Sequence, residues 1–259
     1  MSLIWVNGWR VRSEMPDAFV RLCCTEPKDR VSGFEQIARS HNRTLVCRFS
    51  FSGKNYYYKE YFFPGVYKLL KDLFRGCWNE RAARIHEQLM QTGFSAAPVP
   101  AIGAKGWRRF MVTAEAAGEP IRTFRRKLSQ PDKIELMRRY GEMIGRLHRC
   151  GFSHGDLRWG NILVQPVDGG FGFLLIDNER TQFHRRGIPQ RLCIKNLVHT
   201  RYSGVSEGMD EEEWQVFFNA YCNHFPRAER IKTRLDQQMR RKLKQRIWRG
   251  QKKNQRIRK

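Results

Sequence analysis

Residues 154–161 read HGDLRWGN, and the apolar run ILV follows at 162–164. Asp156 and Asn161 stand five positions apart. At this spacing the catalytic loop of phosphoryl-transferring enzymes places a carboxylate beside the attacking hydroxyl and an amide oxygen on Mg²⁺. The segment before the loop, 132–150, has apolar residues at helical spacing, and the segment after it reads as a β-hairpin, which is the context that such a loop requires. An HGD triplet alone could be a polar turn, but the whole pattern is hard to obtain by chance, so it predicts a site for phosphoryl transfer.

The hairpin after the loop ends in a second candidate metal ligand. The run FGFLLID at 171–177 follows a Gly-Gly turn and places Asp177 at the end of its strand, where a Mg²⁺ ligand is expected. Protein kinases have Phe-Gly after this aspartate, whereas this chain has Asn178-Glu179, a departure common in small-molecule kinases of the same superfamily. We therefore expect Asn161 and Asp177 to hold the metal ion, and the departure weakens the case for a protein kinase.

Two further residues of the loop need an interpretation. Arg158 either neutralises the transferred phosphate or pairs with Asp156, and the sequence leaves both roles open. His154 is expected to make structural hydrogen bonds rather than act as a base, because Asp156 is better placed for that role. Asp156 and Arg158 are therefore the predicted catalytic residues.

The amino-terminal half should supply a lysine from a strand and a glutamate from the next helix. Lys59 lies in YYYKEY and would contact the α- and β-phosphates of a nucleotide, held by an ion pair with Glu80. A lysine that points into a cleft needs such a carboxylate, because a buried unpaired charge is costly. Lys54 and Lys68 are rivals for the first role, and Glu87 is a rival for the second.

The order of elements is strands with one helix, then a linker, then mainly helices. Strands are expected at 44–51, 55–62 and 109–115, and helices at 79–91, 132–150 and from Asp210 onward. The linker AAGEP at 116–120 separates an N-lobe, 1–116, from a C-lobe, 117–226, which a basic tail, 227–259, follows. This order predicts an α+β, two-lobed protein-kinase-like fold with an antiparallel-sheet N-lobe and a mainly helical C-lobe.

Each expected helix presents one apolar face. The inward residues are Ala82, Ile85, Leu89 and Met90 in the first helix, Met137, Tyr140, Ile144 and Leu147 in the second, and Trp214, Phe217, Phe218 and Tyr221 in the third. Such stripes at a period of 3.6 residues predict helices that pack against a core.

Two parts of a nucleotide site follow from position alone. Backbone groups of Glu115 and Ala117, at the end of the strand before the linker, would bind adenine. No GxGxxG lies before Thr44, so the segment 31–43 would have to cover the phosphates with few glycines.

Composition bounds the class of protein. The 259 residues are 41% hydrophobic with 17 Phe and 7 Trp, so the chain is globular. No stretch reaches the roughly 18 apolar residues of a membrane span, and the start lacks the pattern of a secretory signal, so a cytosolic protein is expected. The seven cysteines are odd in number and lack metal-ligand spacing, which predicts reduced thiols.

Basic residues dominate the charge. Lys and Arg number 49 against 25 Asp and Glu, a formal net charge of +24, which implies anionic partners. The tail at 227–259 holds 15 Lys/Arg against two acidic residues, and it could be a solvated helix. We expect instead a basic amphipathic helix on an anionic membrane, because apolar residues recur at helical spacing among the cations: Leu235, Met239, Leu243, and Ile247 or Trp248.

With these residues in place, the chain resembles the lipopolysaccharide core kinase family, whose members phosphorylate heptose or Kdo sugars of the lipid A–core. Residues 43–62, RTLVCRFSFSGKNYYYKEYF, resemble the family's RTLRF…GK.YFvK segment, and 76–89, GCWNERAARIHEQL, resemble its NEW.AI..L helix. RLCIKNL at 191–197 and RYS at 201–203 resemble its R..IKDL…yFS block after the metal aspartate. The resemblance extends over about 31–221 in one order.

This resemblance implies a protein-kinase-like fold, ATP and Mg²⁺ as cofactors, and a lipid A–core glycolipid as acceptor. It also implies a protein that works in the cytoplasm, peripherally bound to the anionic cytoplasmic face of the inner membrane, during lipopolysaccharide biosynthesis. Nucleic acid is not an expected partner.

Two alternatives remain open. An atypical, RIO-like protein kinase would share the loop, but the chain has no DFG and no APE segment. A pseudokinase scaffold that binds anionic partners through the tail would have lost its chemistry, whereas the predicted catalytic and metal residues are all present here.

Overall fold

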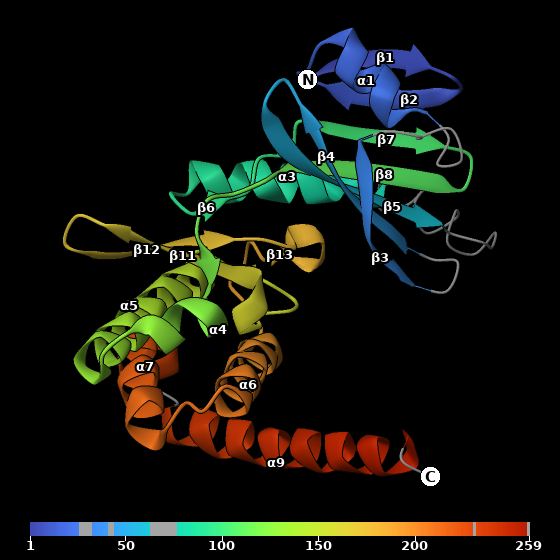
Figure 1. Cartoon of the computed structure of the whole chain (residues 1–259). Helices are drawn as coiled ribbons and strands as arrows, with labels where there is room; N and C mark the ends of the chain where they lie inside the picture. The colour runs from blue at the N-terminus through green and yellow to red at the C-terminus, as the bar shows by residue number, and fades with distance from the viewer. Residues whose placement is uncertain (26–32, 41–43, 63–76, 230–231, 258–259) are drawn as a thin grey trace. The chain divides into compact units, whose positions relative to one another are not determined.

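The computed structural model describes residues 1–25, 33–40, 44–62, 77–229 and 232–257 (Figure 1). The chain divides into two compact units, Met1–Gln91 with Ala96–Ala116, and Thr92–Ser95 with Ala117–Lys259. The rival Lys68 and part of the expected phosphate-covering segment 31–43 lie outside the described residues. The structure describes all seven cysteines and joins none of them in a disulfide.

The first unit is built on an antiparallel sheet of seven strands. Their order across the sheet is β1-β2-β7-β8-β5-β4-β3. The bounds are β1 Ser2–Val6, β2 Trp9–Ser13, β3 Phe34–Ser40, β4 Thr44–Phe51, β5 Lys54–Phe62, β7 Ala101–Lys105 and β8 Arg108–Ala114, with the helices α1 Asp17–Cys23 and α3 Trp78–Gln91. The antiparallel-sheet N-lobe predicted from the sequence is therefore observed.

A two-residue turn sets the register of the central hairpin. Phe51 of β4 pairs with Lys54 of β5, and Ser52 and Gly53 between them have φ values of +49° and +73°. Two consecutive positive φ values define the turn type whose twist matches that of the strands. In this register Lys59 lies opposite Val46 on β4.

Aromatic side chains fill the core of the first unit. Phe19 of α1 contacts Tyr56 at 5.0 Å between ring centroids, and Tyr58 contacts Phe110 at 5.2 Å. The helix α3 buries Ala82 and Leu89 of its expected apolar face, as expected. The prediction for Met90 was wrong, because this side chain is 48% exposed.

The second unit is mainly helical, with a small sheet in the order β6-β12-β11-β9. Its helices are α4 Ile121–Phe124, α5 Gln130–Arg149, α6 Gln190–Ser206, α7 Glu211–His224, α8 Pro226–Glu229 and α9 Lys232–Ile257. Its strands are β6 Ser95–Ala96, β9 Glu119–Pro120, β10 Phe152–Ser153, β11 Ile162–Val167, β12 Gly170–Leu175 and β13 Gln182–Phe183, and its short 3-10 helices are η2 Arg125–Lys127, η3 Trp159–Asn161 and η4 Asn178–Arg180. The hairpin expected after the HGD loop is β11 with β12.

Helices α5 and α7 form the core that supports this hairpin. The predicted inward faces of both helices are buried, and Tyr140 of α5 packs on Phe217 of α7 at 5.1 Å and on Phe173 of β12 at 5.7 Å. The two helices approach closely at Gly141, where a Cβ would collide with the carbonyl oxygen of Phe217. α5 therefore presents a rigid surface beneath the strand that leads to Asp177.

The basic tail is largely one helix, α9, which packs against α6 (Figure 1). Met239 and Leu243 of its expected apolar stripe are buried in the second unit, whereas Trp248 is 55% exposed. The side chains of Leu235 and Ile247 lie outside the described residues. Met239 and Leu243 therefore pack on the protein rather than facing a membrane, and Arg241, Lys242 and Lys244 of the same helix are exposed. No described helix has the length and apolar character to cross a bilayer.

Candidate active site

The HGD loop is folded on itself by hydrogen bonds to one carbonyl. The carbonyl oxygen of Asp156 accepts from the backbone N–H of Arg158 at 2.8 Å and from Nδ2 of Asn161 at 2.9 Å. The backbone N–H of Asn161 in turn donates to the carbonyl of Arg158 at 2.9 Å. Because its Nδ2 is committed inside the loop, Asn161 has Oδ1 left as a ligand for a hard cation.

Buried side chains and a glycine anchor the same loop. Leu157 and Trp159 are fully buried, and the guanidinium of Arg125 lies 5.8 Å from the centroid of the Trp159 ring. Gly155 has φ +78°, and a Cβ there would collide with the carbonyl oxygen of Arg180. This position therefore requires glycine, which explains the middle residue of HGD.

Asp177 follows β12 in a strained conformation. Its φ of +59° and ψ of +42° lie in the left-handed region, which non-glycine residues rarely adopt and which often marks a functional position. Nδ2 of Asn178 fixes the turn by donating to the carbonyl of Leu175 at 2.9 Å. The exposed carboxylate of Asp177 is thereby held just beyond the strand, where the sequence predicts a metal ligand.

Two links join the HGD loop to the Asp177 turn. The backbone N–H of Ile176 donates to the carbonyl of Asn161 at 3.0 Å, and Nε2 of His154 lies 3.0 Å from the carbonyl oxygen of Ile176. Burial lowers the pKa of His154, while the bond to Ile176 and the carboxylates of Asp177 and Asp156 oppose that shift. His154 thus has the structural contacts expected for it, and both aspartates lie close enough to act on one imidazole ring.

One oxygen of Asp156 is flanked by two basic side chains. Its Oδ1 lies 2.8 Å from Nε of Arg158 and 3.2 Å from Nδ1 of His199. The contact with Arg158 is an ion pair, and the contact with His199 brings a ring nitrogen to the same oxygen. Among the described residues Oδ1 is buried without an aligned hydrogen bond. Of the two roles left open for Arg158, the pairing with Asp156 is the one seen here.

The donor set of the second unit fits magnesium. The amide oxygen of Asn161 and the carboxylate of Asp177 are hard oxygen ligands, which Mg²⁺ prefers, usually in small number alongside phosphate oxygens and water. No group of three or more His, Cys, Asp or Glu side chains gathers around a possible metal position among the described residues. Asn161 and Asp177 are thus the described residues that could hold such an ion.

The predicted lysine and glutamate lie in the first unit. Lys59 is half-buried in the middle of β5, opposite Met111 of β8. Glu80 stands in the first turn of α3, and its Oε1 accepts from the guanidinium of Arg10 at 3.2 Å. The rivals Lys54 and Glu87 are exposed. The ion pair of Lys59 with Glu80 stays a prediction.

The carboxylate of Glu115 is held by side chains of the first unit. It accepts hydrogen bonds from Arg48, Asn55 and Tyr57 at 2.7–3.2 Å, and these bonds, chiefly the one from Arg48, lower the pKa of Glu115. Its backbone N–H donates to the carbonyl of Asn55 at 2.9 Å. Of Glu115, only the carbonyl therefore remains for the predicted adenine contact, with the N–H of Ala117 as its companion.

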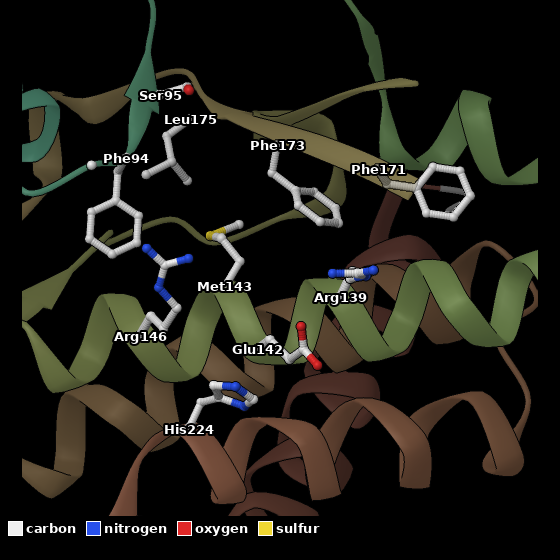
Figure 2. A pocket seen from close by; sticks show the side chains of 11 residues that line it. Phe94, Ser95, Arg139, Glu142, Met143, Arg146, Phe171, Phe173, Leu175 and His224 are labelled. Carbon is white, nitrogen blue, oxygen red and sulfur yellow. The ribbon is translucent and has the colours of Figure 1, made fainter. Parts of the chain in front are cut away.

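A cavity of about 330 Å³ lies between α5 and β12 (Figure 2). None of its lining residues belongs to the HGD loop. Phe94, Phe171 and Phe173 form its apolar side. Among its polar groups, Glu142 accepts a hydrogen bond from Arg138, and Nδ1 of His224 lies 3.0 Å from the backbone carbonyl oxygen of Ala220. We therefore do not assign the cavity to the reaction.

His199 is the residue of the site that the sequence did not reveal. It lies on α6, 43 positions after Asp156, and it falls between the two segments, 191–197 and 201–203, that carry the resemblance there. Only a helix that returns to the loop brings it into contact, and no local spacing encodes that return.

The fold has a known counterpart. The chain superposes on the solved structure described as WaaP in complex with acyl carrier protein with a TM-score of 0.67 and 23% sequence identity, over 91% of this chain and 98% of that chain. At this identity the likeness shows the fold, and it confirms the protein-kinase-like fold predicted from the sequence. The family model for the lipopolysaccharide kinase (Kdo/WaaP) family matches residues 94–221.

This segment, just under half of the chain, is similar to the lipopolysaccharide kinase (Kdo/WaaP) family. The match contains the HGD loop, Asn161, Asp177 and most of α6 and α7, so the resemblance recognised in the sequence is confirmed for the second unit. The segment of this chain that matches the family model begins at residue 94, so Lys59 and Glu80 lie outside it.

Three curated relatives with other names match segments of 97 to 132 residues. The chain is 32% identical over 97 residues to the probable bifunctional tRNA threonylcarbamoyladenosine biosynthesis protein of Methanothermobacter thermautotrophicus, and 26% identical over 132 residues to the KEOPS complex subunit Bud32 of Pyrococcus abyssi. The matches cover 38% and 51% of this chain, and 17% and 59% of those proteins. A Bud32 subunit of Chaetomium globosum is 28% identical over 38% of this chain and 35% of its own length. The chain thus spans less than two thirds of these relatives.

Proposed function

We propose that this chain is an ATP-dependent kinase that phosphorylates a sugar hydroxyl, of heptose or Kdo, in the lipopolysaccharide inner core. The observation that carries the proposal is the hydrogen-bonded link of the HGD loop to the Asp177 turn, through Asn161 and His154. This link holds a carboxylate, an amide oxygen and a second carboxylate around one small region of the second unit. The family match over the same residues supports a sugar of the lipopolysaccharide core as acceptor.

Each residue has a part in the proposed reaction. Asp156 orients the acceptor hydroxyl and takes its proton as the oxygen attacks the γ-phosphorus of ATP and the bond to the β-phosphate oxygen breaks. Asn161 and Asp177 would hold Mg²⁺, which when bound neutralises charge on the phosphates. Lys59, fixed by Glu80, would orient the nucleotide phosphates. These residues act mainly by positioning and by electrostatics, as phosphoryl transfer requires.

The roles can be tested by substitution of the proposed base. Asp156→Ala should abolish ATP-dependent labelling of lipopolysaccharide core, whereas Asp168→Asn, at the exposed tip of the β11–β12 hairpin, should label like the unmodified protein. Labelling is measured with γ-labelled ATP and purified core glycolipid. Near-normal turnover of Asp156→Ala would refute the assignment.

The partial likeness to Bud32 subunits favours one second candidate, an atypical protein kinase. The absence of DFG and APE segments argues against it. Purified core glycolipid and generic protein acceptors offered side by side to the same preparation would separate the two functions. Preferential labelling of protein would support this candidate.

Two further features of the protein in the cell belong to the proposal. We place the chain at the cytoplasmic face of the inner membrane, because its substrate would be a glycolipid and its net charge is +24.

The structural counterpart is described as bound to acyl carrier protein, and we propose that a protein of that kind also binds this chain. Co-elution of purified acyl carrier protein with the chain in size-exclusion chromatography would test that partner.

A further inference from the structure

A histidine of α6 stands against the proposed catalytic base. The Nδ1 atom of His199 lies 3.2 Å from Oδ1 of Asp156, and the His199 side chain is only 13% exposed. A side chain so enclosed has few other rotamers open to it. The contact is therefore a fixed feature of the protein.

The register of α6 against the loop is set by the next residue. Oγ1 of Thr200 donates to the carbonyl of Leu157 at 3.1 Å, and the hydroxyl of Tyr140 on α5 lies 3.1 Å from the same Oγ1. Thr200 and Tyr140 are both buried. Because Leu157 directly follows Asp156 in the chain, this bond carries His199 to the carboxylate whenever α6 is formed.

The two basic side chains at Asp156 differ in rigidity. Arg158 is 54% exposed and reaches Oδ1 from within the loop itself, whereas His199 is 13% exposed and belongs to a separate helix. An exposed arginine loses much rotamer entropy when it is held in one geometry and contributes little. His199 is therefore the better anchor for the orientation of the carboxylate.

The two oxygens of Asp156 thereby become unequal. Oδ1 is buried and faces both basic groups, while the side chain as a whole is 24% exposed. A carboxylate held by one oxygen presents the other to its surroundings, and a general base must lie within hydrogen-bond reach of the proton that it takes. Oδ2 is the oxygen left for the acceptor hydroxyl.

We propose that His199 is a positioning residue for Asp156, which fixes Oδ1 and thereby aims Oδ2 at the hydroxyl that is phosphorylated. This inference rests on the proposed kinase function. In that reaction the new O–P bond forms as the bond to the β-phosphate oxygen breaks, the electron pair leaves with ADP, and the hydroxyl proton passes to Oδ2 of Asp156. In this role His199 acts through Asp156 rather than on the nucleotide or the acceptor.

Steady-state kinetics of three variants test this role. In His199→Asn the amide nitrogen takes nearly the place of Nδ1, so we expect most of the turnover to remain. In His199→Leu no polar group of α6 faces Oδ1 at that position, and kcat for the glycolipid acceptor should fall about 10–100-fold, the usual effect of removing a residue that orients a functional group, with KM for ATP unchanged. Val205→Ala, at an exposed position on the same helix, is the control and should behave like the unmodified protein.

The outcomes that overturn the inference are distinct from a failure of the proposed function. Full turnover of His199→Leu overturns the inference. Equal losses of kcat in His199→Leu and His199→Asn, together with a lowered melting temperature, also overturn it, because they would mean that His199 has a packing role alone. Nitrogen-15 NMR of the imidazole rings needs no activity: Asp156→Asn should move the ring resonances of His199 and leave those of buried His148 in place. If the unmodified protein transfers no phosphate, the kinase proposal fails, yet an unmoved His199 resonance would still overturn the contact.

Discussion

At the scale of single residues, two positions of the candidate site have a positive backbone φ. Gly155 reaches +78° next to the proposed base, and Asp177 reaches +59° at the proposed metal ligand. A non-glycine residue in that region costs of order 1–3 kcal/mol unless its surroundings impose it. The bonds of His154 and Asn178 supply that restraint for Asp177.

Gly155→Ala should destabilise the protein and remove its activity. The new Cβ would meet the carbonyl oxygen of Arg180 in addition to the unfavourable φ, so we expect about 2–4 kcal/mol lower free energy of unfolding. Gly169 has the same φ of +78° with nothing within 4 Å, so Gly169→Ala isolates the φ cost of about 1 kcal/mol. Urea unfolding measures both. Equal losses in the two variants would mean that the collision with Arg180 does not exist.

Side-chain networks lock the helices together at the scale of elements. His148 of α5 lies between α6 and α7: its Nδ1 is 3.0 Å from the hydroxyl of Tyr221, and its Nε2 is 3.0 Å from Nδ2 of Asn196. An amide nitrogen only donates, so Nε2 accepts and the single ring proton belongs on Nδ1. The neutral ring is therefore the form that the packing of these helices selects.

This network predicts a loss of stability on acidification. Burial lowers the pKa of His148 from 6.5 to about 3, so between these values the unfolded chain binds a proton that the folded chain does not. The stabilisation from the neutral ring is complete above about pH 6.5 and is lost as the pH falls toward 3. From pH 7 to pH 5 the free energy of unfolding should fall by about 2 kcal/mol from this group. In His148→Gln that part of the fall should vanish in urea titrations at the two pH values, and equal falls in both proteins would contradict the assignment.

The sequence predicted elements where a local pattern repeats. The inward faces of α5 and α7 were found from their period of 3.6 residues, and the β4–β5 and β11–β12 hairpins from their turns. The prediction that Met90 faces inward was wrong, because the burial of an apolar residue at the edge of a helical face depends on the neighbouring elements and not on the helical period alone. The position of α6 against the HGD loop depends on the Thr200 bond to Leu157, which no pattern along the chain records.

Charge is the property of the whole molecule that bears on its partners. The formal net charge is +24, and α9 presents Arg241, Lys242 and Lys244 as exposed cations while its Met239 and Leu243 are buried. Attraction to an anionic surface would therefore come from its charges rather than from a complete apolar face. Such attraction is screened by salt.

We expect the chain to bind vesicles that contain anionic phospholipid and to bind them less at high salt. Each surface cation contributes about 1 kcal/mol, so changing Arg241, Lys242 and Lys244 to Gln should weaken binding roughly a hundredfold. The matched control changes the exposed Arg12, Arg21 and Arg84 of the first unit to Gln. Vesicle co-sedimentation measures both, and equal losses in the two triple variants would show that α9 has no special part.

The candidate site was predictable to the extent that it is encoded by spacing. Asp156, Asn161 and Asp177 could be proposed from the sequence because a catalytic loop and a hairpin fix their separations along the chain. The partner of Asp156 on α6 was not, because helix packing brings it from 43 positions away. The roles of Lys59 and Glu80 remain predictions that depend on how a nucleotide joins them to the second unit.

Mass spectrometry of the acceptor tests the central claim most directly. Core glycolipid purified from a strain that lacks this gene is incubated with ATP, Mg²⁺ and either the unmodified protein or the Asp156→Asn variant. The mass of the released core oligosaccharide is then measured. We predict that the unmodified protein adds one phosphate to a heptose or Kdo residue and that Asp156→Asn adds none. A glycolipid left unchanged by the unmodified protein, or phosphorylated equally by both, would contradict the account.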